Sequence, residues 1–209
     1  CLAFDQHATL AVYPRVARNT IYCNTTAPAV GIQLSYLIIG TFEENSINPY
    51  MGVRGDAEIP GEVANVINFN GNTFHTGSTY HVVNPLGIWN FNGNTYEGAV
   101  SGTSIVTTPG MVGDCFVLNL HGEDFDDPNP APTGTQARIE TACLQVNIKD
   151  SVISATTGQH GVDAIAGSGQ RLNIDGTFFN LSNVAVDLNT GNCGQITNYR
   201  APSASSVIT

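Results

Sequence analysis

The sequence predicts an all-β protein wound as a parallel β-helix of about five to six coils. The main evidence is a near-duplicate: residues 67–74 and 89–96 share the order Asn-Phe-Asn-Gly-Asn-Thr followed by an aromatic residue, and they lie 22 positions apart. A fixed period of about 20 to 30 residues is typical of architectures in which each unit stacks on the next. The composition agrees, because 22 Gly and only 11% charged residues favour turns and strands over helices.

Weaker copies of the segment continue along the chain as an apolar anchor, a polar residue, a second apolar residue and a corner. The anchors are Ile67, Trp89, Leu118, Val146, Leu172 and, in a degenerate last copy, Ile196. Asn follows each of the first five anchors, so the apolar residues alternate with period 2 and one face is buried. We expect Phe69 to stack on Phe91 inside the coil, and Asn72 and Asn94 to form an amide ladder at a corner.

The repeat divides the chain into three parts. Residues 1–60 lack the pattern and are predicted to form a β-rich N-terminal region, residues 61–199 the β-helix, and residues 200–209 a C-terminal arm. The N-terminal region is the less acidic part, and we expect the docking contacts to a larger assembly there. It carries three of the seven basic residues: Arg15, Arg18 and Arg54.

Charge and hydropathy exclude several kinds of partner. The formal charge is -10 and Lys149 is the single lysine, which argues against nucleic acid, since phosphate binding needs clustered basic residues. The longest apolar run, around Tyr36 to Ile39, is too short to cross a bilayer, so no membrane insertion is expected.

The five cysteines form no C-x-x-C pair and no zinc-like spacing. We expect them to be free, buried side chains of a protein made in the cytoplasm, with disulfides as the open alternative. The first residues lack a basic segment followed by an apolar one, so the sequence predicts no signal peptide.

The dense acidic cluster lies in a Pro-rich loop over residues 122–135 and contains Glu123, Asp124, Asp126 and Asp127. Three interpretations stay open. The carboxylates form a solvated loop, or they bind Ca²⁺, or Asp124, Asp126 and Asp127 supply the acid pair of a glycoside hydrolase. The spacing matches no metal motif, and we expect no cofactor.

Other candidate groups are scattered along the sequence. His75 and His81 are not expected to meet, and no G-x-S-x-G elbow, phosphate loop or dinucleotide fingerprint is present. The sequence therefore does not single out a serine nucleophile.

The late copy Leu172-Asn173-Ile174-Asp175-Gly176 resembles the repeats of the right-handed parallel β-helix of phage tailspikes, appendages and pectate-lyase-like proteins. The resemblance covers residues 61–199. It implies the right-handed fold, a homotrimer of β-helices packed side by side, and a separate N-terminal region that attaches to the virion.

These observations together predict a structural virion-surface protein, either a capsid decoration (cement) protein or a short appendage, bound to the major capsid protein or another virion protein. The alternative is a receptor-binding tailspike with polysaccharide hydrolase or lyase activity, and a third interpretation is a module that binds host surface glycan without cleavage. The expected location is the surface of a bacteriophage virion.

Overall fold

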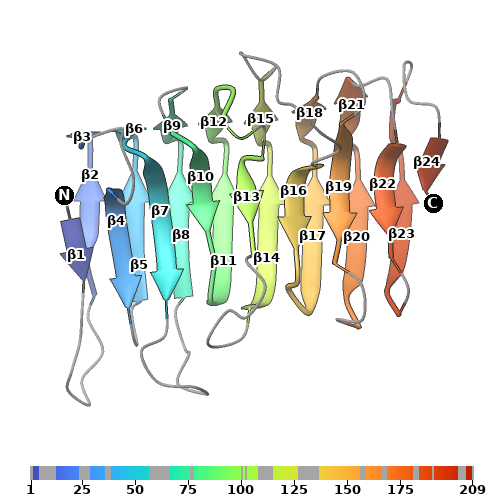
Figure 1. The fold of residues 1–209 in the computed structure, drawn as a ribbon, viewed down its shortest axis with the longest axis horizontal. Coiled ribbons are helices and arrows are strands. Elements are labelled where there is room, and N and C mark those ends of the chain that lie inside the picture. The colour runs from blue at the N-terminus through green and yellow to red at the C-terminus, as the bar shows by residue number, and fades with distance from the viewer. Residues whose placement is uncertain are drawn as a thin grey trace.

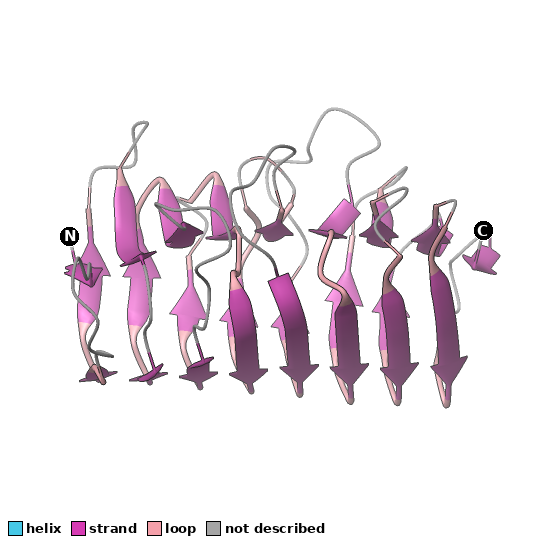
Figure 2. Ribbon diagram, turned by 90° about the horizontal axis from the view of Figure 1, so that it is seen from below, coloured by secondary structure: helices cyan, strands magenta, loops and turns pink. Residues whose placement is uncertain are grey.

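The structure is a computed structural model, and every element in its described part is a β-strand (Figure 2). The described residues are 2–4, 13–23, 29–35, 39–56, 66–75, 78–99, 101, 103–107, 115–126, 137–155, 159–165, 169–180, 184–189, 191–201 and 206–208.

The strands form three sheets. Sheet 1 has the spatial order β1 (Leu2–Phe4), β4 (Val30–Ser35), β7 (Met51–Asp56), β10 (Tyr80–Val83), β13 (Ile105–Val106), β16 (Ala137–Thr141), β19 (His160–Ala164), β22 (Val184–Leu188) and β24 (Ser206–Ile208). Sheet 2 has β2 (Arg15–Ala17), β5 (Ile39–Glu43), β8 (Val66–Asn70), β11 (Gly87–Asn92), β14 (Cys115–His121), β17 (Gln145–Lys149), β20 (Arg171–Asp175) and β23 (Cys193–Thr197). Sheet 3 has β3 (Thr20–Tyr22), β6 (Ser46–Asn48), β9 (Thr73–Phe74), β12 (Thr95–Tyr96), β15 (Asp124–Phe125), β18 (Val152–Ser154) and β21 (Phe178–Asn180).

From β1 to β23 the strands belong to sheets 1, 2 and 3 in turn, and β24 returns to sheet 1. The strand pairs of the described residues are parallel, as in β8 with β11 and β11 with β14. The protein is therefore a right-handed parallel β-helix, which confirms the predicted fold. Figure 1 shows the coils following one another along the long axis, with the two chain ends at opposite ends. Between residues 61 and 199, sheet 2 contains six strands, in agreement with the five to six expected coils.

The core is built from rows of identical positions in successive coils. The anchors pair in register from Ile67 to Trp89 and onward to Leu172, and all are buried. Phe69 stacks on Phe91 with ring centroids 5.0 Å apart, as the repeat predicts. The last copy needs a correction, because Ile196 pairs with Ile174 and so occupies the second apolar position, while the anchor position holds glycine.

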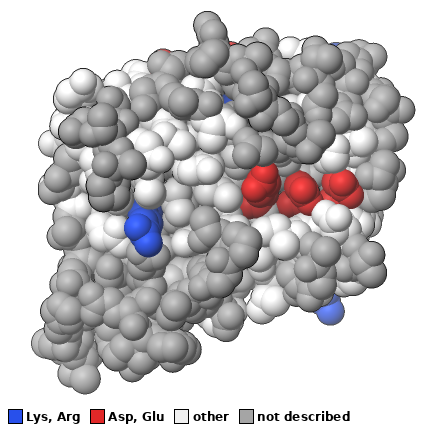
Figure 3. Space-filling model, in the orientation of Figure 1, with Lys and Arg blue, Asp and Glu red and all other residues white. Residues whose placement is uncertain are grey.

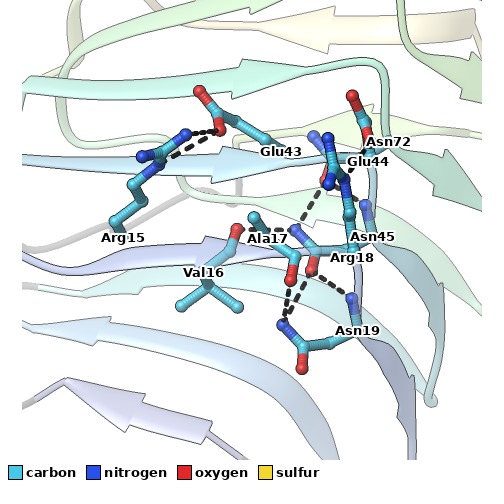
Figure 4. Close-up of polar contacts among 9 residues, drawn as sticks. All are labelled: Arg15, Val16, Ala17, Arg18, Asn19, Glu43, Glu44, Asn45 and Asn72. Carbon is cyan, nitrogen blue, oxygen red and sulfur yellow. Dashed lines mark hydrogen bonds and ion pairs between the residues drawn. The ribbon is translucent and has the colours of Figure 1, made fainter.

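The corner between sheets 2 and 3 explains the glycines of the repeat. Each coil has one residue with positive φ there, and the set is Arg18, Glu44, Gly71, Gly93, Gly122, Asp150, Gly176 and Asn198. The left-handed region favours Gly, Asn and Asp, so the Asn-Gly-Asn motif is a corner motif. The next residue points inward, where Asn72 accepts the backbone N–H of Asn45 at 2.9 Å through Oδ1 (Figure 4). Asn94 does the same for Asn72 at 2.8 Å, which confirms the predicted amide ladder.

The sheets run without interruption across residue 60. Strands β4, β5 and β6 pair with β7, β8 and β9, so the first 60 residues contribute coils of the same three sheets. The coil pattern therefore begins earlier than the repeated sequence indicates.

The cysteines also differ from the prediction of free thiols. Cys115 and Cys143, which begin or precede neighbouring strands of sheet 2, form a disulfide, and Cys23 is disulfide-bonded as well. Cys193 is free and exposed. The expectation of free thiols is therefore wrong for Cys23, Cys115 and Cys143.

Candidate functional site

A serine, a histidine and a glutamate from three successive coils meet on the outer face of sheet 3. Ser46 begins β6, His75 directly follows β9, and Glu97 directly follows β12. Ser46 Oγ lies 2.7 Å from His75 Nε2, and His75 Nδ1 lies 3.1 Å from Glu97 Oε2. When Nδ1 carries the proton and donates to Glu97, Nε2 is left to accept the hydroxyl proton of Ser46.

Backbone pairing fixes the spacing of the three side chains. The His75 N–H donates to Ile47 O at 3.0 Å and the Glu97 N–H to Phe74 O at 2.9 Å, so sheet 3 continues one residue past β9 and β12. On the inner side Phe74 stacks on Tyr96 at 5.0 Å. With the aromatic residues inside, the residues that follow them point outward, one coil apart.

Sequence reasoning missed this cluster, although the near-duplicate contains a signal for it. His75 and Glu97 occupy the same position of the two repeats, directly after the aromatic residue, and adjacent coils bring equal positions side by side. The side chain of His75 meets Glu97, and His75 and His81, which were not expected to meet, are also in contact, because His81 Nε2 lies 3.3 Å from the backbone oxygen of His75. Ser46 comes from the preceding coil, where the repeat is not recognisable.

Two further residues border the cluster. Asn48 lies on the same strand as Ser46, two residues along, and its Oδ1 is buried without a hydrogen-bond partner. Tyr22 pairs with Asn48 in the coil before, and it is 70% exposed. The arrangement thus places a side-chain amide and an exposed aromatic ring beside the serine. The histidine and glutamate side chains are about one-third exposed, so a solvent-borne substrate has access.

A second cluster lies on sheet 1. Glu140, Asp163 and Asp187 are in register on β16, β19 and β22, and Figure 3 shows acidic side chains in line over these strands. His160 Nδ1 is 3.5 Å from Asp187 Oδ2, and Asn189 Nδ2 donates to Asp163 Oδ1 at 2.5 Å.

The surroundings of this acidic row raise the pKa of two of its carboxyls, Glu140 and Asp163. Burial raises the pKa of Glu140 above its ordinary value, and the Asp163 charge adds to this effect. Burial and the Asp187 charge likewise raise the pKa of Asp163. Burial and the Glu140 charge raise the pKa of Tyr80, which lies on the same sheet. An upward shift in pKa is the direction that favours a carboxyl as a general acid.

The predicted acidic-loop site lies only partly within the described residues. Glu123 points inward and is 1% exposed, while Asp124 and Asp126 are exposed on the outer side. Burial and the Asp126 charge raise the pKa of Asp124, so these two carboxyls are neighbours. Asp127 lies outside the described residues. Within the described part, no three His, Cys, Asp or Glu side chains are close enough to hold a metal ion.

The three arginines predicted for docking lie on different surfaces. Arg15 on sheet 2 pairs with Glu43 at 2.9 Å, and Arg18 at the corner pairs with Glu44 at 2.8 Å (Figure 4). Arg54 lies on β7 of sheet 1. The structure does not bring them together, and their docking role stays a prediction.

Comparison with known proteins adds no relative: no family model, curated protein or solved structure matches the chain. None of the described residues forms a helix able to span a membrane.

Proposed function

We propose that the protein hydrolyses carboxylic esters, with Ser46 as the nucleophile, His75 as the general base and Glu97 as the group that orients the histidine. The observation that carries the proposal is the pair of contacts at 2.7 Å and 3.1 Å to the two ring nitrogens of His75. A nucleophile bonded to a base that is itself oriented by a carboxylate is the arrangement by which such triads are recognised, independent of fold.

Each residue has one step in the proposed reaction. Ser46 Oγ attacks the ester carbonyl carbon as its proton passes to His75 Nε2. The C–O bond to the alcohol then breaks, and the alcohol leaves with that proton. A water molecule attacks the acyl-enzyme by the same route and releases the acid. Glu97 stabilises the imidazolium, and we assign Asn48 Nδ2, two residues along β6 from Ser46, as the donor to the oxyanion.

The position of the cluster favours an ester that projects from a larger molecule. The three groups lie on the outer face of an extended sheet and are reached from solvent. Tyr22 offers a flat aromatic surface beside them, suited to stacking on a sugar ring. We therefore assign acyl groups on a polysaccharide as the substrate class.

Hydrolysis of p-nitrophenyl acetate by the purified protein tests the activity. Ser46→Ala should lower kcat/KM at least about a hundredfold, because both the nucleophile and its base contact are lost. Thr20→Ala is the matched control, since Thr20 pairs with Ser46 on the neighbouring strand and should leave the rate unchanged. Equal rates for Ser46→Ala and the unmodified protein would exclude the assignment.

The acidic row favours glycoside hydrolysis as a second candidate function. Strands two positions apart in a sheet are separated by about 9.5 Å, the upper end of the range of about 6.5 to 9.5 Å between the carboxyls of an inverting pair. Glu140 and Asp187 lie two strands apart, with Asp163 on the strand between them. Release of reducing ends from neutral polysaccharides, lost on Asp187→Asn and kept on Asp150→Asn, would support it.

The structural role on a phage virion, with a homotrimer that decorates a capsid or forms an appendage, stays a prediction from the resemblance. Stoichiometric binding to empty capsids that is lost on deletion of residues 1–60 would support that role. Deletion removes strands of all three sheets, so the folding of the shortened chain must be checked first.

A further inference from the structure

An exposed apolar stripe crosses successive coils of sheet 2 near the start of its strands. Its exposed members are Ile39, Ile88, Phe116 and Leu144, which are 39%, 38%, 39% and 48% exposed. Half-buried Val66 pairs with both Ile39 and Ile88, half-buried Val117 pairs with Ile88, and the Leu144 N–H donates to Cys115 O, so the stripe extends from β5 to the start of β17. A contiguous apolar patch of this kind marks a contact surface more often than scattered single residues do.

A ladder of amides runs beside the stripe and already satisfies much of its own hydrogen bonding. The side chains of Asn68, Asn90, Asn119, Asn147 and Asn173 are bonded in sequence from β8 to β20, each Nδ2 donating to the Oδ1 of the coil before, at 2.7 to 3.0 Å. Covering polar groups is costly when they lose hydrogen bonds to water. The ladder keeps these bonds when the face is covered, so the cost of desolvation is reduced.

The low net charge of sheet 2 allows two copies of this acidic protein to meet through this face. Its described outward positions carry three basic residues, Arg15, Lys149 and Arg171, and two acidic ones, Glu43 and Asp175, a net of +1. The whole chain carries -10. Like charges that face each other across an interface are repulsive, and sheet 2 avoids that repulsion.

A two-fold axis that runs parallel to the strands, in front of β11, brings sheet 2 of one copy face to face with sheet 2 of a second copy. The axis places Ile88 against the same residue of the second copy, and Ile39 on β5 opposite Gln145 on β17, one residue from Leu144. Glu43 on β5 and Lys149 on β17 occupy the same row of the sheet. The axis therefore places Glu43 of one copy opposite Lys149 of the other. One operation thus matches the apolar stripes and pairs opposite charges.

The size of the face suits a weak dimer. Strands of five residues, stacked about seven deep, present about 500 Å² of projected surface per copy, or about 1,000 Å² in total. That area lies at the lower limit of a specific interface.

From these observations we infer that the protein forms an isologous dimer through sheet 2, with a second copy of this chain as the occupant of the apolar stripe. The two β-helices run in opposite directions. The site around Ser46 lies on sheet 3 and stays open in the dimer.

Sedimentation equilibrium over a wide range of protein concentrations, up to the millimolar, tests the dimer. Ile88→Asp should weaken association about a hundredfold or more. Ile88 of one copy contacts Ile88 of the other at the axis, so the substitution places two aspartates in the same contact. Val152→Asp is the matched control, since Val152 is 37% exposed on sheet 3 and should have no effect.

Charge reversal tests the geometry of pairing. Glu43→Lys and Lys149→Glu should each weaken the dimer, and the two changes together should restore it, as only opposed residues can compensate. A monomer at every concentration would overturn the inference. So would a trimer, or association that Ile88→Asp leaves unchanged, because these place the contact on another face.

Discussion

The carboxylate of Glu123 accepts the backbone N–H of Asn94 at 3.3 Å, at the corner position that asparagines occupy in the preceding coils. The Asn94 side-chain amide donates to the same carboxylate at 3.1 Å. The ladder of neutral amides therefore ends on a buried acid. Burial raises the pKa of Glu123 from 4.5 to about 7, against the hydrogen bonds from Asn94, which lower it.

This acid makes stability depend on pH. The folded state holds the Glu123 proton more tightly than the unfolded state, so its contribution is complete below about pH 4.5 and is lost as the pH rises through about 7. The loss amounts to about 3 kcal/mol. Glu123→Gln should remove it, so urea unfolding at pH 8 should show the variant more stable than the unmodified protein. An equal or lower free energy of unfolding at pH 8 would contradict the buried-acid account.

His81 gives the opposite dependence. Burial, with the Arg138 charge, lowers its pKa from 6.5 to about 3, and its ring lies 5.8 Å from those of Phe74 and Tyr96. Protonation therefore opposes folding, and stability should fall as the pH drops below about 6.5, by about 2 kcal/mol at pH 5. His81→Phe keeps the ring contacts and should flatten this acid limb. Parallel unfolding curves for the two proteins between pH 7 and pH 5 would refute the prediction.

The Cys115–Cys143 disulfide closes a segment with a sequence separation of 28 residues. Loop-closure entropy for that length predicts a loss of about 3 to 4 kcal/mol in unfolding free energy for the double change Cys115→Ala and Cys143→Ala. Cys193→Ser is the control, because this thiol is free and exposed, and it should leave the melting temperature unchanged. Equal stability of the double variant and the control would show that the crosslink does not constrain the unfolded chain.

The sequence pattern predicts the coils whose anchor residue is apolar, and it misses the coils whose anchor residue is glycine. At the start, Gly40 pairs with Ile67, and a Cβ on Gly40 would lie 2.9 Å from a side-chain carbon of Pro14. At the end, Gly194 pairs with Leu172, and its Cβ would meet Leu188 at 2.9 Å. Packing from neighbouring segments fills the space at both positions, so these coils lack the apolar signal that the pattern requires.

The candidate site was harder to predict for the same reason. Register between equal repeat positions is enough to place His75 beside Glu97. Ser46 belongs to a coil that the repeat does not reveal, and its pairing with Thr73 is known only from the folded chain. The acidic row depends on sheet 1, whose strands follow connections of variable length and share no sequence pattern.

Covalent labelling by a fluorophosphonate tests the central claim most directly, because it reports an activated serine without knowledge of the substrate. Ser46 Oγ should displace fluoride and add one phosphonate to the intact mass, located by peptide mapping to the segment that contains Ser46. His75→Gln should slow labelling, Ser46→Ala should abolish it, and Thr20→Ala should leave it unchanged. No adduct, or an adduct that persists in Ser46→Ala, would contradict the assignment of Ser46, His75 and Glu97 as a catalytic triad.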